Sequence, residues 1–215
     1  MVRVILATDR TCVQEATELL RHGELVCYPT DTLYGIGAAA SDDEAVRRLF
    51  TAKGRPPEKP VPLLIADAGD AARLAEVTPL ARILMARFWP GALTVIMKRA
   101  GGFRSLALAG QETVALRVPD HPLVREIIRS LGEPIIGTSA NRAGAPPPIS
   151  AAEAAVQVGA EVALIIDNGP CPRRQESTII DITQELPQIL REGAVGREKI
   201  EETLRWPLGK SRLGA

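Results

Sequence analysis

The order of apolar and polar positions along the chain predicts an alternation of strands and helices. Short apolar runs bounded by turn residues indicate buried strands, which we expect at residues 2–7, 25–28, 61–66, 92–97, 113–118, 134–141, 162–167, 177–182 and 188–192. Apolar residues at helical spacing predict helices at residues 11–21, 41–52, 70–76, 78–88, 122–131, 150–158 and 198–204. Strands and helices alternate early and strands cluster late, so the pattern favours an α/β protein with a mixed parallel and antiparallel sheet.

Polar residues of the types that cap helices precede several of these helical segments. A short side-chain oxygen at this position can accept a hydrogen bond from a free backbone N–H of the first turn. The candidate caps are Thr11, Thr78, Asp120 and Ser150. Ser41 and Glu44 form a capping-box pattern at the start of the helix expected at residues 41–52.

The length and composition suit one domain with a large core. The chain has 215 residues, of which 46% are apolar, and this fits a domain over residues 1–205 with a C-terminal tail over residues 206–215. No apolar run reaches the ~18 residues of a membrane-spanning helix, and the N-terminus lacks the pattern of a signal peptide. We therefore expect a cytoplasmic protein that does not bind membranes.

Charge, cysteine and histidine content exclude several classes of function. The 26 basic and 26 acidic residues balance, and aromatic residues make up 3% of the chain, so neither a general electrostatic grip on nucleic acid nor a base-stacking surface is supported. Cys12, Cys27 and Cys171 are odd in number and too widely spaced for a disulfide framework or a zinc site. His22 and His121 form no local metal pair, and we expect no metal site made by the protein alone.

A cluster of basic residues and prolines follows the helix expected at residues 41–52. Lys53, Arg55 and Lys59 lie here together with three prolines. Prolines stiffen a loop, and a stiff cationic loop loses little entropy when it binds a polyanion. The alternative is ordinary, since lysine and arginine also favour helix C-termini, where they meet the helix dipole. This segment alone does not separate the two interpretations.

Short polar side chains follow two of the expected strands. Thr30 and Thr32 come directly after one buried strand, and Thr138, Ser139 and Asn141 come at the end of another. Polar groups at the carboxyl ends of strands are the usual position of ligand sites in open α/β sheets. The alternative for the first segment is a turn followed by a strand of small residues at 37–40 packed under a helix, and the alternative for the second is a simple turn.

One cation, Arg117, interrupts the apolar strand expected at residues 113–118. If its side chain points into a cavity, we expect its partner to be a ligand carboxylate, which a guanidinium binds with two parallel hydrogen bonds. The alternative places Arg117 on the solvent face of an edge strand.

Six segments of the chain together resemble one protein family. They occur in this order: residues 28–35 (YPTDTLYG), 53–55 (KGR) with 59–60 (KP), 116–119 (LRVP), 138–141 (TSAN), 177–181 (STIID) and 190–193 (LREG). This set resembles the signature segments of the YrdC/YciO/YwlC family, the threonylcarbamoyl-AMP synthases. The resemblance covers residues 11–205, and six segments in order are far more specific than any one of them.

The resemblance implies a fold and a reaction. The fold would be a twisted mixed sheet with flanking helices around a large, concave, positively lined cavity. The reaction would form L-threonylcarbamoyl-AMP, pyrophosphate and water from L-threonine, bicarbonate and ATP, with Mg²⁺ accompanying the ATP. The product would feed the N6-threonylcarbamoyl modification of adenosine 37 in tRNA through a downstream threonylcarbamoyl transferase complex. Direct contact between this chain and tRNA is left open.

The resemblance also implies a role for each motif residue. The residues implied to be catalytic are Lys53, Arg55, Ser139 and Asn141. The residues implied to contact ATP are Lys53, Arg55, Lys59, Thr138, Ser139, Asn141 and Arg191. The residues implied to bind L-threonine are Thr32, Arg117 and Ser177. Such a transfer mainly needs positioning and charge neutralisation, and the sequence has no Gly-x-Ser-x-Gly, Cys–His or P-loop pattern of a different chemistry.

Two positions depart from the family pattern. Leu64 stands where many members have a histidine, so that histidine is not available for threonine binding here, and Ala143–Gly144 replaces the Ser-Gly that often follows the Ser-x-Asn motif.

Two other functions stay open, an RNA-binding module of the same fold and a carbamoyl-transfer domain as in hydrogenase-maturation proteins. Neutral charge opposes the first, and the second occurs in long multidomain chains.

Overall fold

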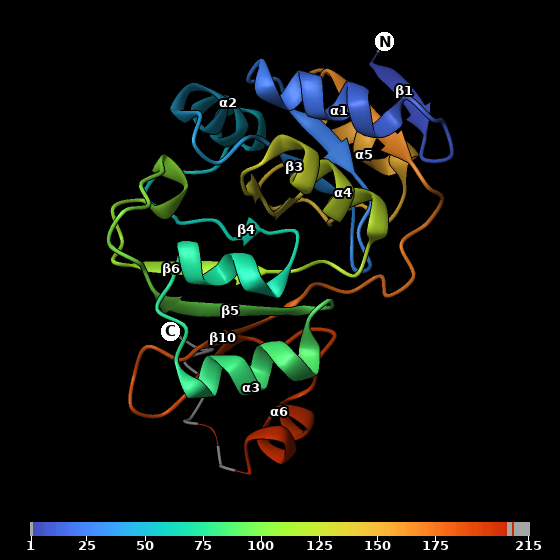
Figure 1. Cartoon of the computed structure of the whole chain (residues 1–215). Coiled ribbons are helices and arrows are strands. Elements are labelled where there is room, and N and C mark those ends of the chain that lie inside the picture. The colour runs from blue at the N-terminus through green and yellow to red at the C-terminus, as the bar shows by residue number, and fades with distance from the viewer. Residues whose placement is uncertain (1, 206–207, 209–215) are drawn as a thin grey trace.

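The computed structural model describes residues 2–205 and residue 208, and its strands form two mixed sheets (Figure 1). The five-stranded sheet has the order β1 (Arg3–Leu6), β9 (Leu164–Asp167), β2 (Val26–Tyr28), β3 (Gly35–Gly37) and β8 (Thr138–Ser139). The six-stranded sheet has the order β11 (Gln188–Arg191), β10 (Thr178–Asp181), β5 (Leu93–Lys98), β6 (Thr113–Arg117), β4 (Leu63–Leu64) and β7 (Ile135–Ile136). The α/β class is confirmed, and each region expected to form a strand contains one.

The strand expected at residues 134–141 is divided between the two sheets. β7 pairs with β4 in the six-stranded sheet, and β8 pairs with β3 in the five-stranded sheet. Gly137 lies between them, and a Cβ atom at this position would come within 2.7 Å of the Leu64 side chain. The chain therefore crosses from one sheet to the other where a glycine lets it pass Leu64, and this crossing carries Ser139 to the space between the sheets.

The helices cover the outer faces of the two sheets. The helices are α1 (Cys12–Arg21), α2 (Asp43–Lys53), α3 (Pro79–Phe88), α4 (Pro122–Leu131), α5 (Ala151–Val158) and α6 (Arg197–Leu204). α1 and α4 pack together on a small core beside the five-stranded sheet, and α3 and α6 pack together below the six-stranded sheet (Figure 1). Two segments form 3-10 helices, η1 (Ala68–Arg73) where an α-helix was expected and η2 (Leu106–Leu108) within an expected loop.

Two of the expected helix caps are confirmed. The Thr78 hydroxyl accepts a hydrogen bond from Ala81 N at 3.2 Å, and the Ser150 hydroxyl accepts one from Glu153 N at 3.3 Å. In both cases the side chain satisfies a free N–H of the first helical turn.

The other three cap predictions are wrong. The carboxylate of Asp42, and not Ser41, caps α2 by accepting hydrogen bonds from the next helical turn. Thr11 occupies the position before α1, but its hydroxyl bonds to the carboxylates of Asp9 and Glu15. α4 begins after His121, and Asp120 gives its backbone N–H to another part of the chain.

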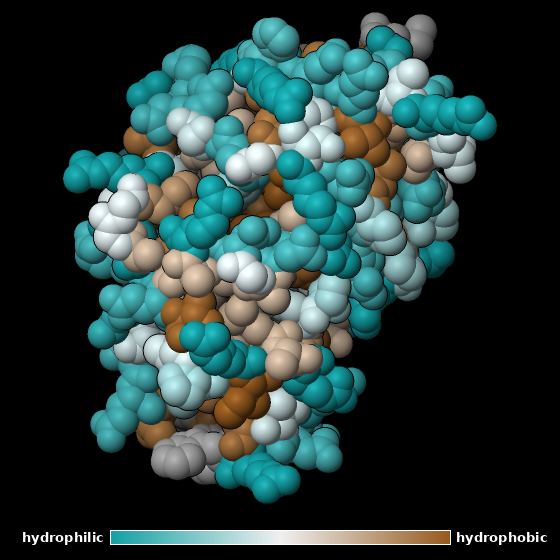
Figure 2. Space-filling view, in the orientation of Figure 1, coloured by the Kyte–Doolittle hydropathy of each residue, from teal (hydrophilic) through white to brown (hydrophobic). Residues whose placement is uncertain are grey.

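On the face in Figure 2, brown and tan patches lie among hydrophilic side chains. Exposed large apolar side chains are spread over several elements: Val4, Leu6, Ile83, Leu106, Val156, Leu186 and Leu190. Within the described residues, none of the helices is both long and apolar enough to cross a membrane. The tail expected at residues 206–215 lies outside the described residues except for Leu208.

The hairpin of β2 and β3 is shaped by Tyr28. Its ring lies over Gly35 and Gly37, and its hydroxyl donates a hydrogen bond to Ile136 O at 2.7 Å. A Cβ atom on Gly37 would come within 2.6 Å of the Tyr28 ring. The two glycines therefore allow the ring to lie flat on the strand and to reach the chain near the crossing between the sheets.

We predict that Gly37→Ala lowers the free energy of unfolding by about 1–3 kcal/mol, because a buried ring cannot yield space without strain. Gly69→Ala is the matched control, since a Cβ atom there meets nothing within 4 Å and the backbone is not in the left-handed region. Denaturant titration of both variants measures the difference. Equal stability of the two variants would contradict the packing argument.

Candidate active site

A cavity of about 510 Å³ lies between the two sheets and is lined by residues from both of them. It contains every site residue predicted from the sequence except Lys59: Thr32, Lys53, Arg55, Arg117, Thr138, Ser139, Asn141, Ser177 and Arg191. Residues that are far apart in the sequence therefore meet in one place. Leu64 and Ala143–Gly144, the two departures from the family pattern, line the same cavity.

Lys53 is the last residue of α2 and is 4% exposed, so the expectation that it lies in a surface loop is wrong. Its ammonium group donates to Ser139 O, to Asn141 O at 2.8 Å and to Asn141 Oδ1 at 3.4 Å. Burial and, to a smaller extent, the nearby charge of Arg55 lower the pKa of Lys53 to about 8. Lys53 therefore ties the end of α2 to the segment that carries Ser139 and Asn141.

Arg55 is partly buried and folds back on its own loop, where its Nη2 donates to Pro60 O at 2.9 Å. Burial lowers its pKa, and the nearby charge of Arg191 adds to this effect. Lys59 is exposed and does not line the cavity, and its backbone oxygen accepts from Arg55 Nε at 3.3 Å. Of these two cations, Arg55 therefore lies at the cavity and Lys59 lies outside it.

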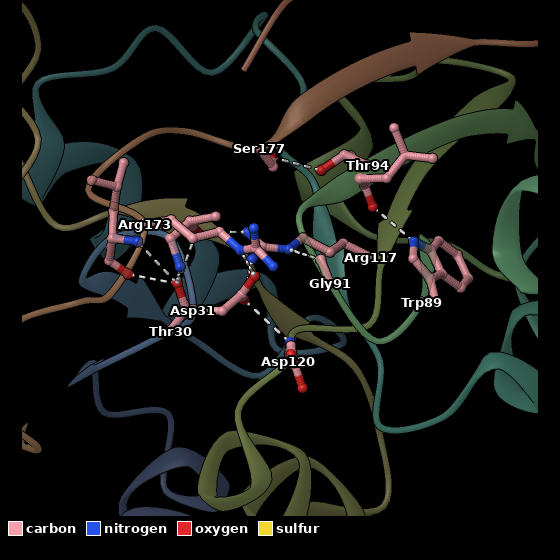
Figure 3. Close-up of polar contacts among 12 residues, drawn as sticks. Thr30, Asp31, Trp89, Gly91, Thr94, Arg117, Asp120, Arg173 and Ser177 are labelled. Atoms are coloured by element: carbon pink, nitrogen blue, oxygen red, sulfur yellow. Dashed lines mark hydrogen bonds and ion pairs between the residues drawn. The ribbon is translucent and has the colours of Figure 1, made fainter. Parts of the chain in front are cut away.

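Arg191 approaches from the end of β11 and fixes the start of β10. Its Nη1 lies 2.6 Å from a carboxylate oxygen of Glu176, and its Nη2 donates to Ser177 Oγ at 3.1 Å. Ser177 Oγ also shares a hydrogen bond of 2.9 Å with Thr94 Oγ1 in β5 (Figure 3). Burial lowers the pKa of Arg191 and outweighs the opposing charge of Glu176.

The cations of Lys53, Arg55 and Arg191 are close enough to affect one another, and the pKa of each is lowered mainly by burial. Glu176 is the one carboxylate among the residues that line the cavity. Such a cluster is costly without a counter-charge, and a bound anion stabilises it. This side of the cavity is therefore suited to a polyanion.

Ser139 and Asn141 form a compact polar pair at the crossing between the sheets. The Ser139 hydroxyl donates to Asn141 Oδ1, and Asn141 Nδ2 donates to Ala145 O at 2.7 Å. The segment is therefore a fixed turn as well as part of the cavity wall, and the two interpretations of it are compatible. Its backbone oxygens accept hydrogen bonds from Lys53, and both residues line the cavity.

Arg117 lies in an interior strand and is 6% exposed, so the alternative of an exposed edge strand is wrong. Its Nε donates to Gly91 O at 2.8 Å, its Nη1 donates to Thr32 Oγ1 at 3.0 Å, and its Nη2 forms an ion pair with the carboxylate of Asp31 (Figure 3). The expectation that a ligand would be its partner is thus incomplete, because the protein itself supplies a counter-charge.

The loop after β2 is shaped by Thr30. Its hydroxyl accepts hydrogen bonds from the backbone N–H of Thr32 and of Leu33, both at 3.1 Å. It also lies 2.9 Å from Thr32 Oγ1. This tight turn directs the Thr32 hydroxyl to Arg117, so the turn expected here has a place in the site.

Three residues of the site were missed by sequence reasoning. Asp31 lies between two threonines that were noted, and Glu176 directly precedes Ser177, so each had a signal in its position beside a candidate. Thr94 is a polar residue within a buried strand, and nothing in its local pattern distinguishes it. Their contacts depend on which strands lie next to each other, which local sequence does not show.

The arrangement offers charge and hydrogen bonding more than covalent catalysis. The three cysteines are buried and free, burial raises the pKa of each, and none of them lines the cavity. One side of the cavity is suited to a polyanion, and the other presents a buried arginine beside hydroxyl groups. A ligand or pair of ligands with phosphate and carboxylate groups would match both.

Comparison with known proteins agrees with this chemistry. The Sua5/YciO/YrdC family model, whose description reads "Telomere recombination", matches residues 18–193. The chain is 40% identical over 201 residues to threonylcarbamoyl-AMP synthase of Bacillus subtilis, covering 93% of this chain and 58% of that protein. It is 37% identical over 171 residues to threonylcarbamoyl-AMP synthase of Chromohalobacter salexigens, covering 79% of this chain and 92% of that protein.

A solved structure, that of P. abyssi Sua5 complexed with L-threonine, superimposes with a TM-score of 0.91 at 35% identity, covering 100% of this chain and 66% of that one. This chain therefore spans somewhat more than half the length of the B. subtilis relative and about two thirds of the Pyrococcus structure. The matched family model covers most of the chain and includes both sides of the cavity. The chain belongs to the Sua5/YciO/YrdC family.

Proposed function

We propose that the protein is a threonylcarbamoyl-AMP synthase, which converts L-threonine, bicarbonate and ATP into L-threonylcarbamoyl-AMP, pyrophosphate and water. The observation that carries the proposal is that one cavity contains two sets of groups, the cations Lys53, Arg55 and Arg191, and the buried Arg117 together with hydroxyl groups. A nucleotide triphosphate fits the first, and an amino acid fits the second. The names of the family relatives support the same reaction.

Phosphate groups would lie against the cationic side. Arg55 and Arg191 have guanidinium groups at the cavity, and a guanidinium can bind phosphate oxygens with two hydrogen bonds. Lys53 would add positive charge while holding Ser139 and Asn141 in place, and Thr138 would complete this wall. Lys59 would reach the outer phosphates only by movement of its loop.

L-Threonine would lie against Arg117, Thr32 and Ser177. Arg117 would bind the carboxylate, and the hydroxyl groups of Thr32 and Ser177 would recognise the ammonium or hydroxyl group of the substrate. Leu64 is 3% exposed and presents methyl groups to the cavity instead of a hydrogen-bonding ring. At that position the protein would contact threonine through its apolar part.

The chemical step would depend on positioning and on charge. The threonine amine and carbon dioxide derived from bicarbonate form a carbamate, the carbamate oxygen attacks the α-phosphorus of ATP, and pyrophosphate leaves. Negative charge develops on phosphate oxygens, and donors placed in advance stabilise it. We assign this role to the cations and to the hydroxyl of Ser139 and the amide of Asn141, which line the cavity and would exchange their present protein acceptors for phosphate oxygens.

Mg²⁺ would enter with the nucleotide. Within residues 2–205 and 208 there is no group of three His, Cys, Asp or Glu side chains that could hold a metal ion. Magnesium is commonly held by one or two carboxylates together with substrate phosphates, and Glu176 is the carboxylate at this cavity. The residues present therefore fit an ion carried by ATP, which would offset phosphate charge.

The product would be consumed by a transferase that attaches the threonylcarbamoyl group to adenosine 37 of tRNA. Threonylcarbamoyl-AMP is a mixed anhydride, so a second enzyme must accept it before water does. We expect this exchange in the cytoplasm. The balanced charge of the chain does not favour strong binding of tRNA by this protein itself.

We predict that release of pyrophosphate from ATP requires both threonine and bicarbonate. Release should fall sharply in buffer depleted of carbon dioxide and return when bicarbonate is added, because no other carboxyl donor enters the reaction. A coupled pyrophosphate assay with several amino acids measures this. Unchanged release in depleted buffer would indicate direct adenylation of the amino-acid carboxylate instead.

We predict that Arg117→Lys raises the KM for threonine by more than tenfold and leaves the KM for ATP within about threefold. An ammonium group cannot reproduce the planar fork that holds two oxygens at once, and a charge-assisted hydrogen bond contributes about 1.5–3 kcal/mol. Steady-state kinetics with each substrate varied separately measure both constants. A threonine KM of Arg117→Lys equal to that of the wild type would contradict the assignment of Arg117 to threonine binding.

We predict that ATP binding weakens as the pH rises through about 8, the pKa of Lys53. Above this value the amine loses its positive charge and one N–H donor, so the dissociation constant of ATP should rise roughly threefold or more by about pH 9.5. The pKa of Lys53 in the folded protein lies below the ~10.4 of a free lysine, so the contribution of this group to stability rises, and does not fall, as the pH increases through this window.

Calorimetry of wild type and of Lys53→Met across this pH range tests the prediction. The methionine variant should bind ATP more weakly at about pH 7.5 and show no titration near pH 8. An ATP affinity of the wild type that stays constant across the range would rule out a role for the Lys53 charge.

A further inference from the structure

We propose that Asp31 is a positioning residue, whose carboxylate is held from outside by Arg173 and fixes Arg117 in the orientation that receives the amino-acid carboxylate. The inference rests on the proposed function, because it takes Arg117 to bind L-threonine. Asp31 is not among the residues that line the cavity, and its carboxylate forms an ion pair with the guanidinium group of Arg117 (Figure 3). It would act on the substrate only through Arg117.

The hydrogen bonds of Arg117 show how its orientation is set. A guanidinium group has five N–H donors, and three of its nitrogens each give one to the protein, namely to Gly91 O, Thr32 Oγ1 and Asp31 Oδ1. One N–H on each terminal nitrogen remains. Two donors on neighbouring nitrogens are what a carboxylate needs for a bidentate contact. The contact with Asp31 fixes the plane in which those two donors lie.

Burial makes the counter-charge necessary. Within the part of the chain that the structure describes, Arg117–Asp31 is the one ion pair whose two side chains are both buried. An uncompensated arginine at this depth would favour other arrangements of the loop, because its charge would be desolvated without a partner. Asp31 therefore stabilises the charged side chain of Arg117 in the site before the substrate binds.

Arg173 completes a set of three charges. Its Nε lies 3.4 Å from Asp31 Oδ2, and its backbone N–H donates to Asp31 O at 3.2 Å. Asp31 Oδ1 also accepts from Asp120 N at 3.1 Å. The Arg117–Asp31–Arg173 group has a net charge of +1, so one substrate carboxylate would bring it to neutrality. Asp31 thus has a fixed position and a compensated charge at the same time.

The test compares Asp31→Asn with the wild type and with a matched control. Asparagine keeps an oxygen for Arg117 but places an amide without negative charge between two arginines. Asp67→Asn is the control, because Asp67 also lies between two arginines, Arg125 at 2.5 Å and Arg129 at 2.9 Å, but on the surface and away from this cavity. Binding of L-threonine and of ATP is measured by calorimetry, with kinetics and thermal unfolding alongside.

We expect Asp31→Asn to raise the threonine dissociation constant and KM by tenfold or more, while the ATP dissociation constant stays within about twofold and kcat at saturating threonine within about threefold. Asp67→Asn should leave all of these at wild-type values. A folded Asp31→Asn protein with wild-type threonine binding would overturn the proposal. Equal weakening of threonine and ATP binding would also overturn it, because that pattern indicates general damage to the structure.

Arg173→Gln keeps the proposal testable if Asp31→Asn does not fold. The Arg173 side chain is 45% exposed, so its replacement should not prevent folding. We expect it to raise the threonine dissociation constant three- to tenfold, and an unchanged value would overturn the proposal.

Arg117→Lys separates this idea from the proposed function. If Arg117→Lys loses threonine and Asp31→Asn does not, only the inference about Asp31 fails. If Arg117→Lys binds threonine normally, the assignment of Arg117 itself fails.

Discussion

The buried ion pair between Arg117 and Asp31 is the interaction on which the arrangement of the site depends. Taking two charges out of water is costly, and their attraction recovers that cost only where the geometry is good and the remaining donors are satisfied. Both sheets contribute to this satisfaction, because Arg117 ends β6 of one sheet while Asp31 and Thr32 follow β2 of the other. The pair therefore links the two sheets at this place.

The cationic cluster of the cavity differs from this ion pair in how its charge is balanced. Burial is the main cause that lowers the pKa of Lys53, Arg55 and Arg191, and Glu176 offsets part of the charge of Lys53 and Arg191. The fold holds this cluster together through backbone oxygens and through packing, so the cost is present before any ligand arrives. A polyanion that binds only the folded state would therefore stabilise the whole domain. The charge of Arg117 is balanced within the protein, whereas the remaining positive charge of the cationic cluster is balanced only when an anionic ligand binds.

Much of the site could be predicted from the sequence because its residues lie next to strands or in motifs of the family. Thr32 and Ser139 were expected near the carboxyl ends of strands and Ser177 at the start of one, and the sheets bring them to one cavity. The directions of side chains could not be predicted in the same way. Lys53 was expected to face a ligand from a loop, but it is buried and bonded to a segment far along the chain. Asp31 was passed over for the same reason, since its partner is defined by tertiary packing.

Local patterns also failed where two neighbouring residues could play the same part. Ser41 and Asp42 are both good capping residues, and the path of the chain into α2 selects Asp42. The apolar run at residues 134–141 reads as one strand, and only the approach of Leu64 to Gly137 shows why it divides. Propensity indicates which elements form, whereas contacts between distant segments decide where they begin and end.

The order of strands has a consequence for synthesis. Neither sheet is continuous in sequence, because β1 pairs with β9 and the chain enters the second sheet before the first is complete. Such long-range pairing gives slow folding, since distant segments must meet before their contacts can form. On the ribosome, the five-stranded sheet is incomplete until β9 has emerged, and the six-stranded sheet is incomplete until β11 has emerged. Arg191, a wall of the cavity, lies at the end of that last strand. The cavity of the nascent chain is therefore incomplete until Arg191 has been made.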